Sequence, residues 1–84
     1  MNVTLKLYAT LTDYLPPAAR ALNLVRMDVP EEATIESVTA PLRLPPKLVH
    51  LVLVNGVFVP ADARPTHRVR EGDVIAIWPP IAGG

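Results

Sequence analysis

Cysteine is absent from this 84-residue sequence, which excludes disulfide bonds and cysteine-rich metal sites as sources of stability. A chain of this length forms one small domain and buries only about 60 to 65% of the surface that its unfolded state exposes. Packing alone must therefore stabilise the fold. Half of the residues are hydrophobic, so we expect a single domain with an efficiently packed core.

An excess of charge of one sign is also lacking, because eight basic residues are balanced by eight acidic ones. Nucleic-acid binding requires a basic surface, so we expect no nucleic-acid partner. No apolar run is long enough to span a membrane, and residues 1–9 alternate polar or charged side chains with apolar ones, unlike a signal peptide. The sequence therefore predicts a cytoplasmic protein that has no membrane partner.

Sets of residues that could perform catalysis are scarce as well. Ser37 is the only serine, and its position in the first turn of a predicted helix favours a hydrogen bond to the backbone over nucleophilic chemistry. His50 and His67 lack a second histidine or a carboxylate at ligand spacing, so we expect no metal site. The isolated aspartates are interpreted as solvated surface groups: Asp13, Asp28, Asp62 and Asp73. We therefore expect a protein that is not an enzyme and has no bound cofactor.

The pattern of hydrophobic residues predicts two strands and a short helix in the first half of the chain. Alternation over residues 3–7 indicates a strand with one buried face, and residues 22–29 indicate a second strand that contains one irregularity or bulge and pairs with the first. Between them, residues 10–15 form a helical turn that two prolines end. The main helix begins after Thr34, and because Pro41 restricts the preceding residue away from helical angles, we expect only about two turns.

The second half of the chain predicts three more strands. Residues 48–54 are nearly continuous in leucine and valine, as in a central strand that is buried on both faces. Asn55 and Gly56 indicate a tight turn, after which residues 57–59 return antiparallel. The closing strand covers residues 74–77.

This order of elements predicts an α+β fold in which a mixed sheet packs on one main helix. With the first strand beside the last, the fold is a β-grasp, the ubiquitin-like architecture, although other small α+β sandwiches fit the same pattern. We expect this domain to span residues 1–78. Residues 79–84 would then form an extended C-terminal tail ending in Gly-Gly, which at about 3.3 Å per residue reaches about 20 Å. A frayed terminus is the simpler alternative for this tail.

Three groups of residues carry a likeness to a known family. They are Val54-Asn55-Gly56 with Val59-Pro60, Glu71-Gly72-Asp73-Val74, and Pro79-Pro80-Ile81-Ala82-Gly83-Gly84. On these motifs the chain resembles the ubiquitin-like sulfur carriers (MoaD/ThiS), and within them the small subunit of molybdopterin synthase. The likeness spans essentially the whole chain, loosely before Val49 and closely after it. Trp78 departs from the phenylalanine that is usual at its position.

The resemblance implies a carrier rather than an enzyme. An E1-like adenylating enzyme would use ATP and magnesium to adenylate the C-terminal Gly84, and sulfur would then replace AMP to give a thiocarboxylate. The tail would insert into the large subunit of molybdopterin synthase, which builds the dithiolene of the molybdenum cofactor. Expected contacts with these partners are Phe58, Trp78, Pro79, Pro80, Ile81, Ala82 and Gly83. Both aromatic side chains could instead belong to the core.

Other functions of a β-grasp protein fit the same sequence. The chain could carry sulfur for thiazole and thiamine synthesis or for another sulfur pathway, although Pro79 and Pro80 favour the molybdopterin branch. It could be a ubiquitin-like protein modifier whose Gly84 forms an isopeptide bond with a lysine of a target. It could also be an interaction module with an inert tail.

Overall fold

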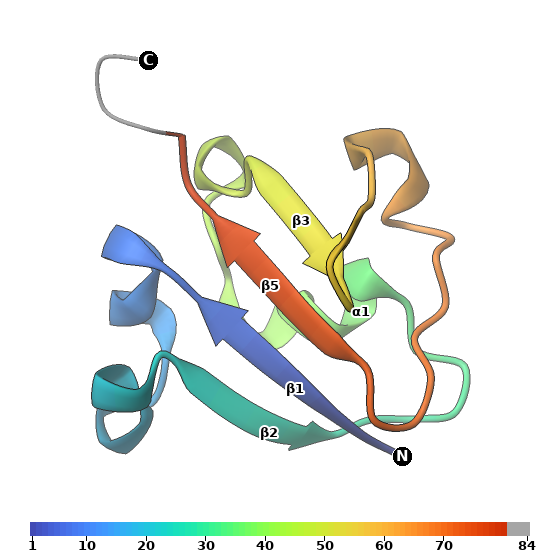
Figure 1. Ribbon diagram of the computed structural model, residues 1–84, viewed down its shortest axis with the longest axis horizontal. Coiled ribbons are helices and arrows are strands. Elements are labelled where there is room, and N and C mark those ends of the chain that lie inside the picture. Colours follow the sequence, from blue (N-terminus) through green and yellow to red (C-terminus); the bar gives the residue numbers. More distant parts are fainter. Residues whose placement is uncertain (81–84) are drawn as a thin grey trace.

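The computed structural model describes residues 1–80, and a mixed sheet organises this part of the chain. Its strands, in chain order, are β1 (Asn2–Leu7), β2 (Leu24–Asp28), β3 (Leu51–Val54), β4 (Val57–Phe58) and β5 (Val74–Trp78). The order across the sheet is β2-β1-β5-β3-β4, with β1 parallel to β5 and the other neighbours antiparallel (Figure 1). The first strand therefore lies beside the last, as predicted for a β-grasp.

One short α-helix, α1 (Ile35–Thr39), begins at a reciprocal cap. The Thr34 hydroxyl accepts the Ser37 backbone N–H at 3.2 Å, and the Ser37 hydroxyl accepts the Thr34 N–H at 2.8 Å. The capping role predicted for Ser37 is confirmed. Pro41 acts differently from the prediction, because Ala40 keeps helical angles (φ −52°, ψ −44°) and the chain continues directly into a 3₁₀ turn.

The remaining helical segments are 3₁₀ turns that connect the strands. They are η1 (Ala9–Tyr14), η2 (Pro17–Leu22), η3 (Ala40–Leu42), η4 (Pro46–Leu48) and η5 (Ala61–Ala63). The α-helix α1 lies behind the strands in the view of Figure 1.

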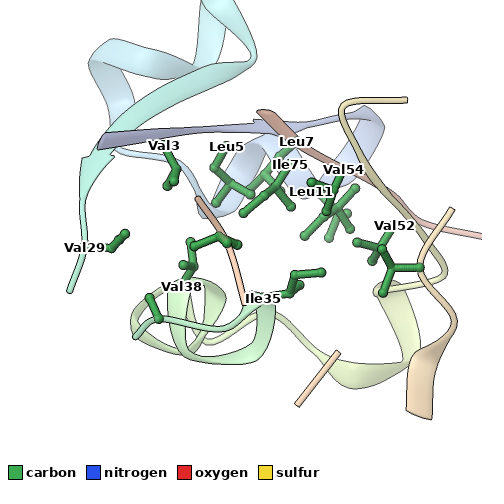
Figure 2. Packing of buried hydrophobic residues seen from close by; sticks show 14 of the residues in the cluster. Val3, Leu5, Leu7, Leu11, Val29, Ile35, Val38, Val52, Val54 and Ile75 are labelled. Carbon is green, nitrogen blue, oxygen red and sulfur yellow. The ribbon is translucent and has the colours of Figure 1, made fainter. Parts of the chain in front are cut away.

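The hydrophobic core lies between α1 and one face of the sheet. Leu5 and Leu7 of β1 point toward Ile35 and Val38 of α1, and all four are at most 2% exposed (Figure 2). Val52 and Val54 of β3, and Ile75 and Ile77 of β5, extend the same layer. Burial of this layer is the main source of stability in a domain without cross-links.

One prediction about the strands is wrong. β3 begins at Leu51, since Leu48 belongs to η4, and its residues are alternately buried and half-buried because helices cover only one face of the sheet. The irregularity predicted within residues 22–29 lies at Asn23, which adopts a left-handed conformation with φ 61° directly before β2. It is not a bulge, since the register of β2 with β1 is continuous from Asp28 to Leu24.

Two of the motifs that carry the family likeness meet at one end of the sheet. Asn55 and Gly56, with φ of 51° and 83°, form the tight turn between β3 and β4. The Asn55 side-chain amide donates to the Asp73 carboxylate at 2.9 Å and its carbonyl accepts the Val74 N–H at 2.9 Å. Asp73 also accepts the Arg70 N–H, so its interpretation as an isolated solvated group is wrong.

Candidate functional site: the end of β5 and the open face of the sheet

The candidate site begins where β5 ends, at Trp78. Beyond it, Pro79 is half-buried and Pro80 is exposed. The predicted tail residues Ile81, Ala82, Gly83 and Gly84 lie outside the described residues, so the boundary between a domain at 1–78 and a tail at 79–84 stays a prediction. The described part of the site is therefore the point from which the C-terminal segment departs.

This point of departure is held from both sides. On the β1 side, the Tyr8 N–H donates to the Ile77 carbonyl at 3.2 Å, and on the β3 side, the His50 N–H donates to the Trp78 carbonyl at 3.1 Å. β5 is a central strand, so both of its backbone edges find partners up to its last residue. The direction in which the chain enters Pro79 is consequently determined by the sheet.

An aromatic stack covers the same point. The rings of Tyr8 and Trp78 are parallel to within 4° and their centroids are 4.3 Å apart. Trp78 is half-buried, so its ring lies at the rim of the sheet rather than in the core. Stacked pairs of this kind contribute about 0.5 to 1.5 kcal/mol beyond their buried area, and the stack stiffens the end of β5.

Tyr8 was not among the site residues predicted from the sequence. Its only signal was its place directly after β1, and its role depends on the parallel pairing of β1 with β5, which brings Leu7 opposite Ile77. The residues that follow this pair, Tyr8 and Trp78, consequently meet on the face opposite to the core. The pattern of residues around Tyr8 therefore could not indicate its contact with Trp78.

Hydrophobic side chains gather on the face of the sheet that no helix covers. In the strand register, Leu53 is paired with both Phe58 and Ala76, and Leu51 is paired with Trp78. We call this group the open-face patch; it consists of Tyr8, Leu51, Leu53, Phe58, Ala76 and Trp78. Phe58 is 55% exposed, which excludes it from the core. An exposed apolar patch of this kind is typical of a protein-binding surface.

Basic residues border the open-face patch. Lys6 is paired with Ala76 across the sheet, and Arg26 lies one strand further, opposite Thr4. A partner with an apolar centre and an acidic rim would therefore complement this face, as in many specific interfaces.

Within residues 1–80, no group of three or more metal-ligating side chains comes together. His50 is exposed and His67 half-buried, and both contribute to the described hydrogen bonds through their backbone groups. In the same range of residues, no helix has the length and apolar character needed to cross a membrane.

Solved structures of similar proteins share this fold. SAMP1 from Haloferax volcanii is 23% identical, with a TM-score of 0.71 and full coverage of both chains. The Haloferax volcanii HVO 2177 protein is 23% identical with a TM-score of 0.72, covering 100% of this chain and 87% of that one. A putative molybdopterin converting factor, subunit 1, from Pyrococcus furiosus is 18% identical with a TM-score of 0.67, covering 96% and 99%.

Sequence comparison identifies the family. No curated protein gives a significant match. The model of the ThiS family matches residues 18–84, which includes β2 to β5 and the Gly-Gly motif. Together with the β-grasp topology, this match establishes that the chain belongs to the ThiS family of ubiquitin-like sulfur carriers.

Proposed function

We propose that this protein is the sulfur carrier of molybdopterin synthesis and that its C-terminal Gly84 becomes a thiocarboxylate. The observation that supports the proposal most is the ThiS family match, which runs through Gly83 and Gly84. Pro79 and Pro80 before these residues, and the likeness of the fold to a putative molybdopterin converting factor subunit, favour the molybdopterin branch.

The chemistry takes place at one carboxylate. An oxygen of the Gly84 carboxylate attacks the α-phosphorus of ATP in an E1-like enzyme, which forms an acyl-adenylate and releases pyrophosphate. A sulfide-level sulfur then attacks the carbonyl carbon, and AMP leaves. ATP and magnesium belong to the activating enzyme. The large subunit of molybdopterin synthase is the proposed acceptor of the sulfur.

The described residues contribute binding and direction. The open-face patch supplies apolar area for docking, with Phe58 and Trp78 as proposed anchors, because aromatic side chains commonly dominate interface energies. The hydrogen bonds to Ile77 and Trp78 hold the end of β5, from which the chain continues toward Gly84 beside the docked face. Fixed geometry of this kind is what acyl transfer requires.

A second candidate function uses the same activated carboxylate. SAMP1, whose fold this chain shares, is described as a small archaeal modifier protein. If a lysine amine rather than sulfur attacks the acyl-adenylate, the product is an isopeptide bond to a target protein. Both functions need Gly84 and an E1-like partner, and they differ in the nucleophile. A role in thiazole synthesis differs only in the final acceptor.

The experiment that tests the proposal adds one alanine after Gly84. The added residue displaces the carboxylate by about 3.3 Å, which removes it from the position at which adenylation takes place. We expect ATP–pyrophosphate exchange with the cognate activating enzyme to be abolished, while the melting temperature stays unchanged. Full exchange activity, with mass spectrometry confirming that the alanine is still attached, would contradict the proposal.

A further inference from the structure

Arg64 makes an unusual set of contacts for an arginine in a loop. It follows η5, is half-buried, and its guanidinium donates to three backbone carbonyls: that of Val49 at 3.1 Å, that of His50 at 3.2 Å and that of Val59 at 3.4 Å. Its own carbonyl accepts the Glu36 N–H of α1 at 3.3 Å. Arg64 thus connects α1, the loop after β4 and the segment that precedes β3.

The segment that Arg64 holds is the one that contacts the end of β5. His50 uses both of its backbone groups here, since its carbonyl accepts from Arg64 and its N–H donates to the Trp78 carbonyl. The strand pairing between β3 and β5 begins at Leu51 opposite Trp78, so residues 49 and 50 lie just outside the regular ladder. Their position consequently depends on contacts such as those with Arg64.

Two of these contacts, those to Val49 and Val59, are partly buried, whereas the contact to His50 is exposed. Desolvation lowers the pKa of the Arg64 guanidinium below its ordinary value, and an arginine remains charged even so. A partly desolvated cation is stabilised by well-placed acceptors, and hydrogen bonds from a charged donor are about twice as strong as neutral ones. The planar guanidinium also fits three separate carbonyls in a way that an ammonium group does not.

We propose that Arg64 is a positioning residue for the activation of Gly84. Through the His50 peptide it holds the Trp78 carbonyl, and thereby sets the direction in which the chain enters Pro79. The inference rests on the proposed function, in which a docked carrier must deliver its carboxylate to one place. If the hold is lost, only a fraction of carriers present the segment correctly, and the apparent affinity falls by that fraction.

The test replaces Arg64 by methionine, which keeps a long side chain and removes the donors. In ATP–pyrophosphate exchange with the cognate enzyme, we expect the KM for the carrier to rise about five-fold with kcat unchanged, because saturation restores the docked state. Arg70→Met is the matched control. Arg70 is exposed and lies before β5, at the end of the sheet opposite to Trp78, so this variant should behave as the unmodified protein.

Hydrogen exchange of single amides gives a readout that does not need the activating enzyme. In Arg64→Met, the His50 amide should exchange about ten-fold faster through local opening. The Asn55 amide, which donates to the Val74 carbonyl at 2.9 Å at the other end of the same strand pair, should be unaffected. Equal acceleration of both amides would mean that Arg64 supports only global stability, which overturns the proposal.

Arg64→Lys sharpens the test, because lysine keeps the charge but not the planar fork. We expect its KM and its His50 exchange rate to lie between those of the unmodified protein and of Arg64→Met. Unchanged KM and His50 exchange in a folded Met variant overturn the proposal, and so does unfolding of both variants at the assay temperature. Failure of the unmodified protein to be activated contradicts the proposed function instead. Hydrogen exchange of the His50 amide then still tests whether Arg64 holds the Trp78 carbonyl.

Discussion

The two faces of the sheet consist of alternate residues of the same strands, yet they differ in burial. On the face toward α1, Leu5, Leu7, Ile75 and Ile77 are completely buried. On the other face, the open-face patch is largely half-buried and includes Phe58 at 55% exposure. Side chains that are inaccessible can only stabilise the domain, whereas exposed apolar side chains gain contacts only when a partner covers them.

The largest expected effect is on the covered face. Leu5→Ala removes most of a completely buried side chain beside α1 and should lower the free energy of unfolding by about 3 kcal/mol. Lys6→Ala, the neighbouring residue on the open face, should lower it by less than about 1 kcal/mol. Urea denaturation measures both values. Equal losses would remove the distinction between the two faces.

A smaller effect is expected at the boundary between the faces. Trp78→Ala removes the stack on Tyr8, which costs about 1 kcal/mol of stability beyond the apolar area that the half-buried ring loses, and should weaken binding to the proposed partner, the large synthase subunit, by about 2 kcal/mol or about 30-fold in Kd. Trp78→Phe, which restores the side chain usual in the resembling subunits, should recover most of the affinity.

Calorimetric titration and thermal unfolding of the two Trp78 variants give the two free energies separately. Collapse of the fold in Trp78→Ala with unchanged partner affinity would assign Trp78 to the core. The end of β5 would then belong to the covered face of the sheet.

The smallest effect belongs to the edge of the open face. Phe58→Ala should weaken partner binding by about 1 kcal/mol, or about five-fold, and change stability by less than about 0.5 kcal/mol. Val57→Ala is the matched control, because Val57 is 68% exposed but pairs with Val54 and so points to the other side of β4. Equal loss of affinity in both variants would show that the partner covers the strand edge rather than one face.

The α+β layout could be predicted from the sequence because its strands alternate and its turns have distinctive residues. This pattern also fits other small α+β sandwiches, and it was the family resemblance that singled out the β-grasp. The burial of β3 could not be predicted, since a run of leucine and valine is the same whether one face or both faces of the strand are covered. Here the half-buried Leu51 and Leu53 belong to the open-face patch. The prediction took the uncovered face of the sheet for a second core face.

Contacts between distant segments limited what could be predicted for the site. The stack of Tyr8 on Trp78 follows from a parallel pairing of strands that are remote in the sequence. Arg64 donates to backbone carbonyls, which every residue possesses, so no residue type marks its partners. The hydrogen bond between Asn55 and Asp73 likewise joins two turns, each of which was predicted from its own residues alone.

The most direct test of the carrier account is the intact mass of the protein after incubation with a cognate E1-like enzyme, ATP and a sulfur donor. The account predicts one oxygen-to-sulfur exchange, which fragmentation places on Gly84. Modification at another residue, or no modification with any of several cognate enzymes, would contradict the account.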